Sequence, residues 1–486
     1  MMKPFIHYSK FLTILLISML FFSCEDEDEV RPDSLNVAVA NDFDTMFGVT
    51  VELDGSRTSD ASGAPITYSW EAVSFPGDHF APASLEDANS PIAKFTPLQV
   101  GEFVFRLTAS TEFESQSANL MVRVDAEIVE VGGVLSGVTE TWGRTTPEGM
   151  PDYRITSVVS MRESQITVLP GVEIEMTEGV GINVEANSFF NLEGTEEEPI
   201  IIQGRENTKG YWGSIRWVSG SSENRMIHVH VSDGGRNRNN DRGMITFGNN
   251  GRLHMENCKL SNAANAGLEL GIVTSRSNLN LTHIANDYKE NVRPVLAKAD
   301  YYHFFDSESD YTGNEQDIID SRSSFTSTPS GDLVWQKLNV PYVSGGFGVD
   351  ADLVIEAGAI IKVEGGNDLI RVVNGTLKVE GTEDDPVIFE GMESGAGAWQ
   401  GIYVTSSGGN SISHAVIRDT GSSPLTTGAS RAAVFVRSGT LSIDNILFAD
   451  GLGYAYGTWG GAPLITVGEN IRLENMALGE TNMQED

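Results

Sequence analysis

Two stretches of the chain are near-copies of one another. Residues 192–204 read LEGTEEEPIIIQG, and residues 379–391 read VEGTEDDPVIFEG, 187 positions later. In each copy an acidic turn ends at a proline, and a run rich in β-branched residues follows, which is the pattern of a turn that leads into a strand. The chain therefore uses the same turn and strand twice, and its fold has to explain why.

The duplication extends well beyond these two stretches. Aligned without a gap at an offset of 187, residues 166–215 and 353–402 are identical at 15 of 50 positions. The recurring residues include Gly171/Gly358, Gly194/Gly381, Pro199/Pro386, Gly204/Gly391 and Trp212/Trp399 and, after a slip of one position, His228/His414 and Asp233/Asp419. A whole module is therefore present twice.

Each module consists of short strand-like runs separated by Gly, Asn and Asp turns, with no helical period. Two-residue hairpin turns are missing, which argues against antiparallel pairing of neighbouring strands. Parallel strands without intervening helices require the chain to coil, so that successive turns of the coil stack as rungs of roughly 23 residues. We expect Asn257 to lie at a bend where asparagines stack between rungs.

A different β unit precedes the modules. Residues 36–126 alternate apolar and polar positions between turns; in GEFVFRLTAS, Phe103, Phe105 and Leu107 share one face. The order LDGS…ITYSWE…FTP…FRLTAS resembles a PKD-type, immunoglobulin-like domain. The resemblance implies a β-sandwich with Trp70 in its core.

Asp54 and Asp60 of this unit leave a calcium site open as an alternative, although aspartate is equally common in such turns. No other cofactor is expected.

The module sequence also resembles a known family. LPGVEIEM at residues 169–176 and GYWGSI at residues 210–215, together with the repeated turn, look like the right-handed parallel β-helix modules of Bacteroidetes surface lipoproteins. The resemblance covers about residues 133–477, with a first module at 133–330, including connecting coils, and a second module at 331–477. It implies an all-β architecture and a location, and it implies no catalytic residues.

The N-terminus reads as a targeting segment. Residues 1–23 contain Lys3 and Lys10, no acids, and an apolar run too short for a membrane span, as in a signal peptide. Cys24 and the acidic tether at 24–35 resemble a bacterial lipoprotein signal with the surface-export run of Bacteroidetes lipoproteins. We therefore expect an acylated Cys24, an outer-membrane lipid anchor and exposure at the cell surface.

Charge and cysteine content narrow the function classes. The chain has 32 Lys and Arg against 68 Asp and Glu, a net charge of −36, which becomes −38 without the two lysines of residues 1–23. Such a charge repels nucleic acid, which is not an expected partner. The cysteines Cys24 and Cys258 form no zinc spacing, and the pattern around Cys258 predicts a small buried side chain.

Few side chains suggest chemistry. The acidic turns at 196–198 and 383–385 are expected to be solvated, and the recurrence of His228 as His414 favours a role in the fold over metal binding. The basic loop at 233–243 is the candidate ligand-binding site: Arg236, Arg238 and Arg242 suit the carboxylates of an acidic glycan, with a plain solvated loop as the alternative.

These observations predict a non-catalytic, lipid-anchored surface protein that binds glycan or protein, including another outer-membrane protein, or serves as an adhesive or structural rod. The rival hypothesis is a β-helix polysaccharide lyase or glycoside hydrolase acting on acidic polysaccharide. No paired carboxylates of a hydrolase and no lyase base beside an acidic cluster can be identified in the sequence.

Overall fold

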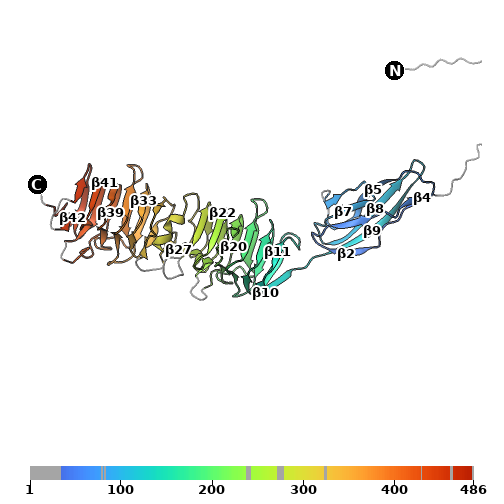
Figure 1. Cartoon of the computed structure of the whole chain (residues 1–486), viewed down its shortest axis with the longest axis horizontal. Coiled ribbons are helices and arrows are strands. Elements are labelled where there is room, and N and C mark those ends of the chain that lie inside the picture. The colour runs from blue at the N-terminus through green and yellow to red at the C-terminus, as the bar shows by residue number, and fades with distance from the viewer. Residues whose placement is uncertain are drawn as a thin grey trace, which may run out of the picture. The chain divides into compact units, whose positions relative to one another are not determined.

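The computed structural model describes residues 34–77, 80–81, 84–236, 242–270, 279–321, 326–427, 430–459 and 464–483. The chain divides into two compact units: the first is built mainly from residues 51–95 and 102–122, and the second contains residues 123–486. The described residues are predominantly β (Figure 1). The signal segment, Cys24 and nearly all of the acidic tether lie outside the described residues.

The first unit contains two facing antiparallel sheets. Their strand orders are β2-β9-β8-β5 and β3-β7-β6, and β1 pairs separately with β4. The strands are β1 (Leu35–Asn36), β2 (Phe43–Met46), β3 (Val51–Asp54), β4 (Ser59–Asp60), β5 (Thr67–Ser74), β6 (Leu85–Glu86), β7 (Ile92–Phe95), β8 (Gly101–Ser110) and β9 (Ser115–Asp125).

The core of this unit follows the predicted alternation. Phe103, Phe105 and Leu107 of β8 are buried, whereas Arg106 between them is exposed. Trp70 is 3% exposed, and its indole Nε1 donates a hydrogen bond to the Ser90 carbonyl oxygen at 3.2 Å. The predicted role of the tryptophan in the core is confirmed.

The second unit is a long series of parallel strands, which lie side by side in Figure 1. Its first half contains β10 (Val129–Ser136), β11 (Thr139–Trp142), β12 (Tyr153–Arg162), β13 (Gln165–Val168), β14 (Glu173–Met176), β15 (Ile182–Val184), β16 (Phe189–Glu193), β17 (Ile200–Gly204), β18 (Ile215–Trp217), β19 (Arg225–Ile227), β20 (Val229–Ser232), β21 (Gly243–Phe247), β22 (Arg252–Glu256), β23 (Lys259–Ser261), β24 (Ala266–Leu270), β25 (Asn280–Ile284), β26 (Asp287–Lys289) and β27 (Arg293–Ala297).

A 3₁₀ helix, η2 (Ala299–Phe304), separates this half from the next. The second half contains β28 (Ile319–Asp320), β29 (Thr326–Ser327), β30 (Asp332–Trp335), β31 (Tyr342–Ser344), β32 (Phe347–Val349), β33 (Asp352–Glu356), β34 (Ile360–Val363), β35 (Leu369–Val372), β36 (Thr376–Glu380), β37 (Val387–Gly391), β38 (Gly401–Val404), β39 (Gly409–Arg418), β40 (Ala432–Val436), β41 (Thr440–Gly451), β42 (Tyr454–Thr458), β43 (Ile465–Val467) and β44 (Arg472–Met476).

Strands pair with strands that come one rung later in the sequence. One sheet has the order β11-β13-β16-β19-β22-β25, another has the order β29-β32-β35-β38-β40-β42, and the remaining strands of the unit form a 23-stranded sheet. The expected parallel pairing is therefore present, and it starts at Val129, slightly before the predicted boundary at residue 133. The estimate of a uniform rung was wrong: Tyr342 and its partner Ile361 are 19 residues apart, but Asn191 and Arg225 are 34 apart.

Aliphatic columns form the core of this unit. Ile174, Ile202, Val231, Leu260 and Tyr288 occupy one register position on successive paired strands, and each is at most 1% exposed. Because side chains alternate along a strand, their neighbours point outward. The same alternation buries Val229 and Val231 and leaves His230 half-buried, as predicted.

The recurring residues have the same structural role in both modules. The indole Nε1 of Trp212 donates to the Ser232 carbonyl oxygen at 2.7 Å, and that of Trp399 donates to the Arg418 carbonyl oxygen at 2.7 Å. A Cβ added to Gly194 would lie 2.7 Å from the His228 carbonyl oxygen. The turn recurs because each copy joins the same pair of stacked rungs.

The recurring histidines occupy backbone bends. His228 and His414 have φ of 48° and 49°, in the left-handed region, and Asn257 follows on the next rung with φ of 52°. Asparagine adopts this conformation at low cost, and histidine is also enriched there. The predicted bend at Asn257 is confirmed, and the conformation of the two histidines supports a role in the fold.

Candidate functional site

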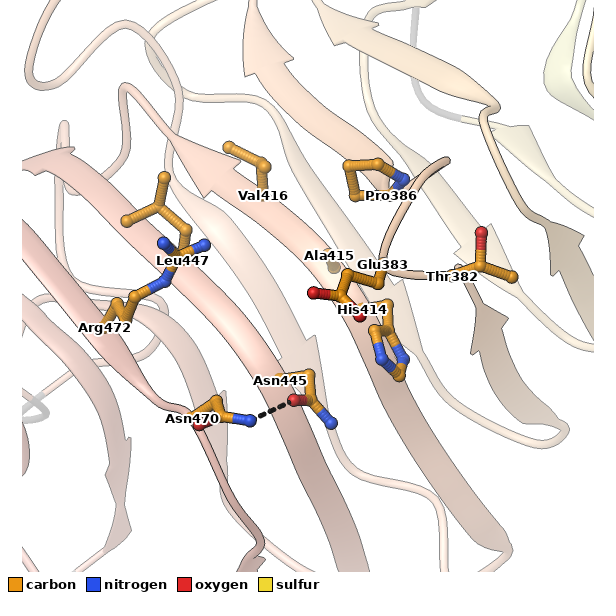
Figure 2. A pocket seen from close by; sticks show the side chains of 10 residues that line it. All are labelled: Thr382, Glu383, Pro386, His414, Ala415, Val416, Asn445, Leu447, Asn470 and Arg472. Carbon is orange, nitrogen blue, oxygen red and sulfur yellow. Dashed lines mark hydrogen bonds between the residues drawn. The ribbon is translucent and has the colours of Figure 1, made fainter.

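An open groove crosses neighbouring strands of the second module and has a volume of about 370 Å³. Figure 2 shows its side chains, which come from the turn after β36 and from β39, β41 and β44. We call it the turn groove; it is lined by Thr382, Glu383, Pro386, His414, Ala415, Val416, Asn445, Leu447, Asn470 and Arg472.

One wall is the recurring acidic turn. The Thr382 Oγ1 accepts a hydrogen bond from the Asp385 backbone N–H at 3.1 Å, and the Thr382 N–H donates to the Asp385 carbonyl oxygen at 3.1 Å. These two bonds close the turn and leave Glu383 exposed. In Figure 2 the Glu383 side chain lies over Ala415 and close to His414. The turn therefore holds a carboxylate at the groove.

A second margin is a column of bend residues. His414, Asn445 and Asn470 have φ between 49° and 54° on successive rungs. The Asn470 Nδ2 donates to the Asn445 Oδ1 at 2.7 Å, and the His414 Nδ1 lies 3.0 Å from the Ser413 Oγ. These contacts fix an imidazole and two amides along one side of the groove.

The floor between these margins is aliphatic. Val416 of β39 pairs with Leu447 of β41, and Leu447 pairs with Arg472 of β44. Val416 and Leu447 are half-buried, whereas Arg472 is exposed. Within the described part of the chain, neither Arg472 nor Glu383 belongs to an ion pair. Both charged groups are therefore available to a ligand.

This lining suits reversible binding of a polyhydroxylated ligand. Carboxylate, guanidinium, imidazole and amide groups together supply donors and acceptors for hydroxyl groups, and the aliphatic floor can accept a less polar ring face. Glu383 is the only carboxylate among the ten lining residues, whereas hydrolysis by glycosidases typically requires two. Among the described residues, no group of three or more His, Cys, Asp or Glu side chains could hold a metal ion.

The first module carries different side chains at the floor positions. His230 pairs with Lys259, and Lys259 pairs with Asp287, in the places of Val416, Leu447 and Arg472. Burial, helped by the charge of Lys259, lowers the pKa of His230. The two modules therefore share the turn and its bend residues but not the chemistry of the floor.

The basic loop predicted from the sequence is only partly described. Arg236 and Arg242 are exposed, and Arg238 lies outside the described residues. The Arg236 Nη1 lies 3.1 Å from the Glu178 Oε1, with both side chains more than half exposed, and the Arg242 backbone N–H donates to the Glu269 Oε2 at 2.5 Å. Glycan binding by this loop stays a prediction.

The acidic residues of the first unit serve its turns. The Asp54 Oδ1 accepts the Ser56 N–H at 2.8 Å, and the Asp60 Oδ1 accepts the Ser62 N–H at 2.8 Å. Hydrogen bonds from Ser62 and Ser34 lower the pKa of Asp60 to about 2. These contacts account for both aspartates as turn residues, and calcium binding stays an untested alternative.

A Tyr–His–Asp chain lies in the interior near the end of the first module. The His283 Nδ1 is 2.6 Å from the Asp306 Oδ2, and its Nε2 is 2.7 Å from the Tyr288 hydroxyl. Burial raises the pKa of Tyr288 well above its ordinary value. Because Tyr288 is 0% exposed and His283 is 4% exposed, a substrate cannot reach either side chain, and the chain of hydrogen bonds stabilises the core. Cys258 is likewise buried, as predicted.

The sequence alone did not identify the turn groove. Val416 and Leu447 are 31 positions apart and become neighbours only when β39 and β41 are paired. An available signal was the appearance of Val and Leu at outward strand positions where the first module has His230 and Lys259.

Comparison with known proteins identifies the first unit. Residues 42–124 match the family model for the PKD domain of KIAA0319-like proteins. Over 99 residues, the chain is 35% identical to the mouse (Mus musculus) dyslexia-associated protein KIAA0319-like protein, which covers 20% of this chain and 9% of that protein. The chain thus matches only a small part of this curated relative. Residues 42–124 form a PKD-like domain.

Two solved structures are also similar in part. The solution structure of the PKD domain from KIAA 1837 protein is 30% identical and covers 20% of this chain and 92% of its own, with a TM-score of 0.16. A nucleoside hydrolase-related hypothetical protein from Saccharophagus degradans, described as associated with carbohydrate metabolism, is 22% identical over 18% of this chain and 25% of its own, with a TM-score of 0.17. Neither alignment includes most of the parallel strands.

Proposed function

We propose that this chain is a non-catalytic, lipid-anchored cell-surface protein that binds carbohydrate in the turn groove. The anchor is an acylated Cys24, the PKD-like domain follows it, and the parallel strands form a right-handed β-helix of the kind found in Bacteroidetes surface lipoproteins. The observation that carries the binding function is the lining of the groove: a carboxylate, a guanidinium, an imidazole and two amides surround an aliphatic floor.

The β-helix is supported by the strand pairing. Parallel strands recur on successive rungs with few helices between them, and one aliphatic core runs through both modules. A coil of this kind offers a series of outward side chains at fixed spacing, about 4.8 Å from strand to strand. Such spacing suits recognition of an extended polymer better than that of a compact small molecule.

The surface location rests on the N-terminal sequence. A short apolar run, a cysteine and an acidic stretch follow one another over residues 11–29. Dual acylation gives stable anchoring without a membrane-spanning helix. Among the described residues, no helix is long and apolar enough to span a bilayer.

The alternative function is a lyase that acts on acidic polysaccharide. The groove contains His414, a residue type that can abstract a proton, and Arg472, which can neutralise a uronate carboxylate. A lyase would release an unsaturated product that absorbs in the ultraviolet, whereas a binding protein releases none.

The test is a screen of neutral and acidic oligosaccharides for binding and for product, followed by exchange of the floor between modules. We expect Leu447→Lys to weaken the wild-type interaction about tenfold, because the lysine replaces apolar contact with a charged side chain. The matched control, Lys259→Leu, changes the corresponding position of the first module and should leave affinity unchanged.

Equal affinity of Leu447→Lys and wild type, or the absence of binding to every saccharide, would show that the groove is not a carbohydrate site. Accumulation of an ultraviolet-absorbing product would replace the binding function with the lyase.

A further inference from the structure

A second surface of the β unit combines aromatic rings with free positive charge. It lies on the outer side of the sheet β29-β32-β35-β38-β40-β42, away from the turn groove residues. Arg371, Tyr403 and Phe435 occupy one outward register position on three neighbouring strands. Arg437 and Trp459 follow two residues further along the last strands. We call this surface the arginine face.

Each arginine lies over an aromatic ring. The Arg371 Cζ is 5.8 Å from the centre of the Tyr403 ring, and the Arg437 Cζ is 5.2 Å from the centre of the Trp459 indole. At these distances a guanidinium is attracted to the ring face, which holds it in one orientation. Both guanidinium groups are thus preorganised, and less conformational entropy is lost when an anion binds them.

The base of the arginine face is rigid. Tyr403 and Phe435 are 5% and 1% exposed, and they pack with Leu425 from the segment between β39 and β40. Trp459, by contrast, is 44% exposed. The surface therefore combines a fixed support with an indole that is open to a ligand.

The charge of the arginine face is not neutralised by the protein. Arg371 and Arg437 are both exposed, and neither forms an ion pair with a carboxylate of the described residues. The one hydrogen bond of the Arg437 guanidinium with a described residue goes to the Thr426 Oγ1 at 3.3 Å. In a chain with 68 acidic residues, two unpaired arginines on one face form a local positive site.

The spacing of the arginines selects the ligand. Two strand spacings and two residues along the strand separate their Cα atoms by about 12 Å. One carboxylate cannot bridge that distance, so the site fits a chain that carries anionic groups at intervals. Duplex nucleic acid, with about one charge per 1.7 Å of axis, would be repelled by the net charge of −36 more strongly than two arginines can offset.

We propose that the arginine face binds an anionic polysaccharide, with carboxylate or sulfate groups on Arg371 and Arg437 and a sugar ring against Trp459. Arginine forks form bidentate hydrogen bonds with such anions, and an exposed indole provides a flat apolar surface for the ring. This site is independent of the turn groove and takes a different class of ligand.

The test uses oligogalacturonate for the carboxylate form, chondroitin sulfate oligosaccharide for the sulfated form and dextran as the neutral control. We expect the wild-type protein to bind at least one anionic oligosaccharide and not dextran, with affinity falling as salt increases. The variant Arg371→Gln/Arg437→Gln should bind about tenfold or more weakly, and Trp459→Ala should weaken binding without changing its salt dependence.

The matched control is Arg162→Gln. Arg162 is also exposed, but it forms an ion pair with Glu185 at 3.2 Å, so its removal should leave affinity unchanged. Leu447→Lys should also have no effect, which separates this site from the turn groove. Wild-type binding to no anionic oligosaccharide, unchanged binding by the double variant, or equal binding of single-stranded DNA would each overturn the proposal.

Discussion

Replacing Gly381 by alanine would place a methyl carbon 2.0 Å from the His414 carbonyl oxygen and 3.0 Å from the Val387 nitrogen. All the neighbouring atoms at these distances belong to the backbone, so no side chain can rotate away. The strand β36 and the bend at His414 would have to separate. Such overpacking costs about 1–3 kcal/mol of folding free energy, and the shortness of this contact places Gly381→Ala at the upper end.

A control is available on a neighbouring strand. Gly409 begins β39, has no atom within 4 Å of an added Cβ, and does not have a positive φ. Gly409→Ala should therefore stabilise the protein by about 0.4–1 kcal/mol, because alanine restricts the unfolded chain. The two substitutions are chemically identical but should change stability in opposite directions.

Urea unfolding followed by circular dichroism measures both effects through the midpoint and the slope of the transition. Gly194→Ala, with a contact of 2.7 Å to the His228 carbonyl oxygen, should destabilise less than Gly381→Ala. If Gly381→Ala unfolds at the wild-type urea concentration, the close approach between turn and bend does not exist. If Gly409→Ala loses as much stability as Gly381→Ala, the effect is a general intolerance of substitution.

Two further predictions concern the buried hydrogen-bond chain and the anchor. Burial raises the pKa of Asp306, but the hydrogen bond and charge of His283 outweigh it and lower the pKa to about 2 from an ordinary 3.8. Asp306 should therefore contribute about 2 kcal/mol above pH 4, lost as pH falls toward 2; Asp306→Asn should remove this dependence from urea midpoints measured across pH, and an unchanged dependence would contradict it. Cys24→Ala should yield soluble protein or unprocessed precursor in membrane fractionation, and a processed, membrane-bound variant would disprove acylation.

The fold was largely predictable because its determinants are local and repeated. The spacing of Gly194, Pro199 and Trp212, repeated 187 positions later, predicted a second copy of the same rung structure. The lengths of the rungs were not predictable, since loops of different length can join strands that pair in the same way. The 3₁₀ helix at Ala299–Phe304 occurs where no strand pattern was visible, and its Tyr302 hydroxyl bonds the Val343 carbonyl oxygen at 2.5 Å.

The candidate sites were less accessible to sequence reasoning. The arginine face joins Arg371 to Arg437 across β35, β38 and β40, and only the strand register shows that these side chains share a face. The three arginines of the basic loop drew attention because they are adjacent in sequence. Side chains that meet through parallel pairing have no such local signature.

The recurrence of the turn has a consequence for how function can be located in this molecule. The two modules are in effect two related sequences folded under identical conditions, and each serves as the reference for the other. Gly, Pro, Trp and the bend histidine are retained in both, and their contacts show that the backbone requires them. A residue that differs between copies at an outward position, as Leu447 differs from Lys259, is free of that requirement. Divergence within one chain thus separates what the scaffold needs from what a ligand selects.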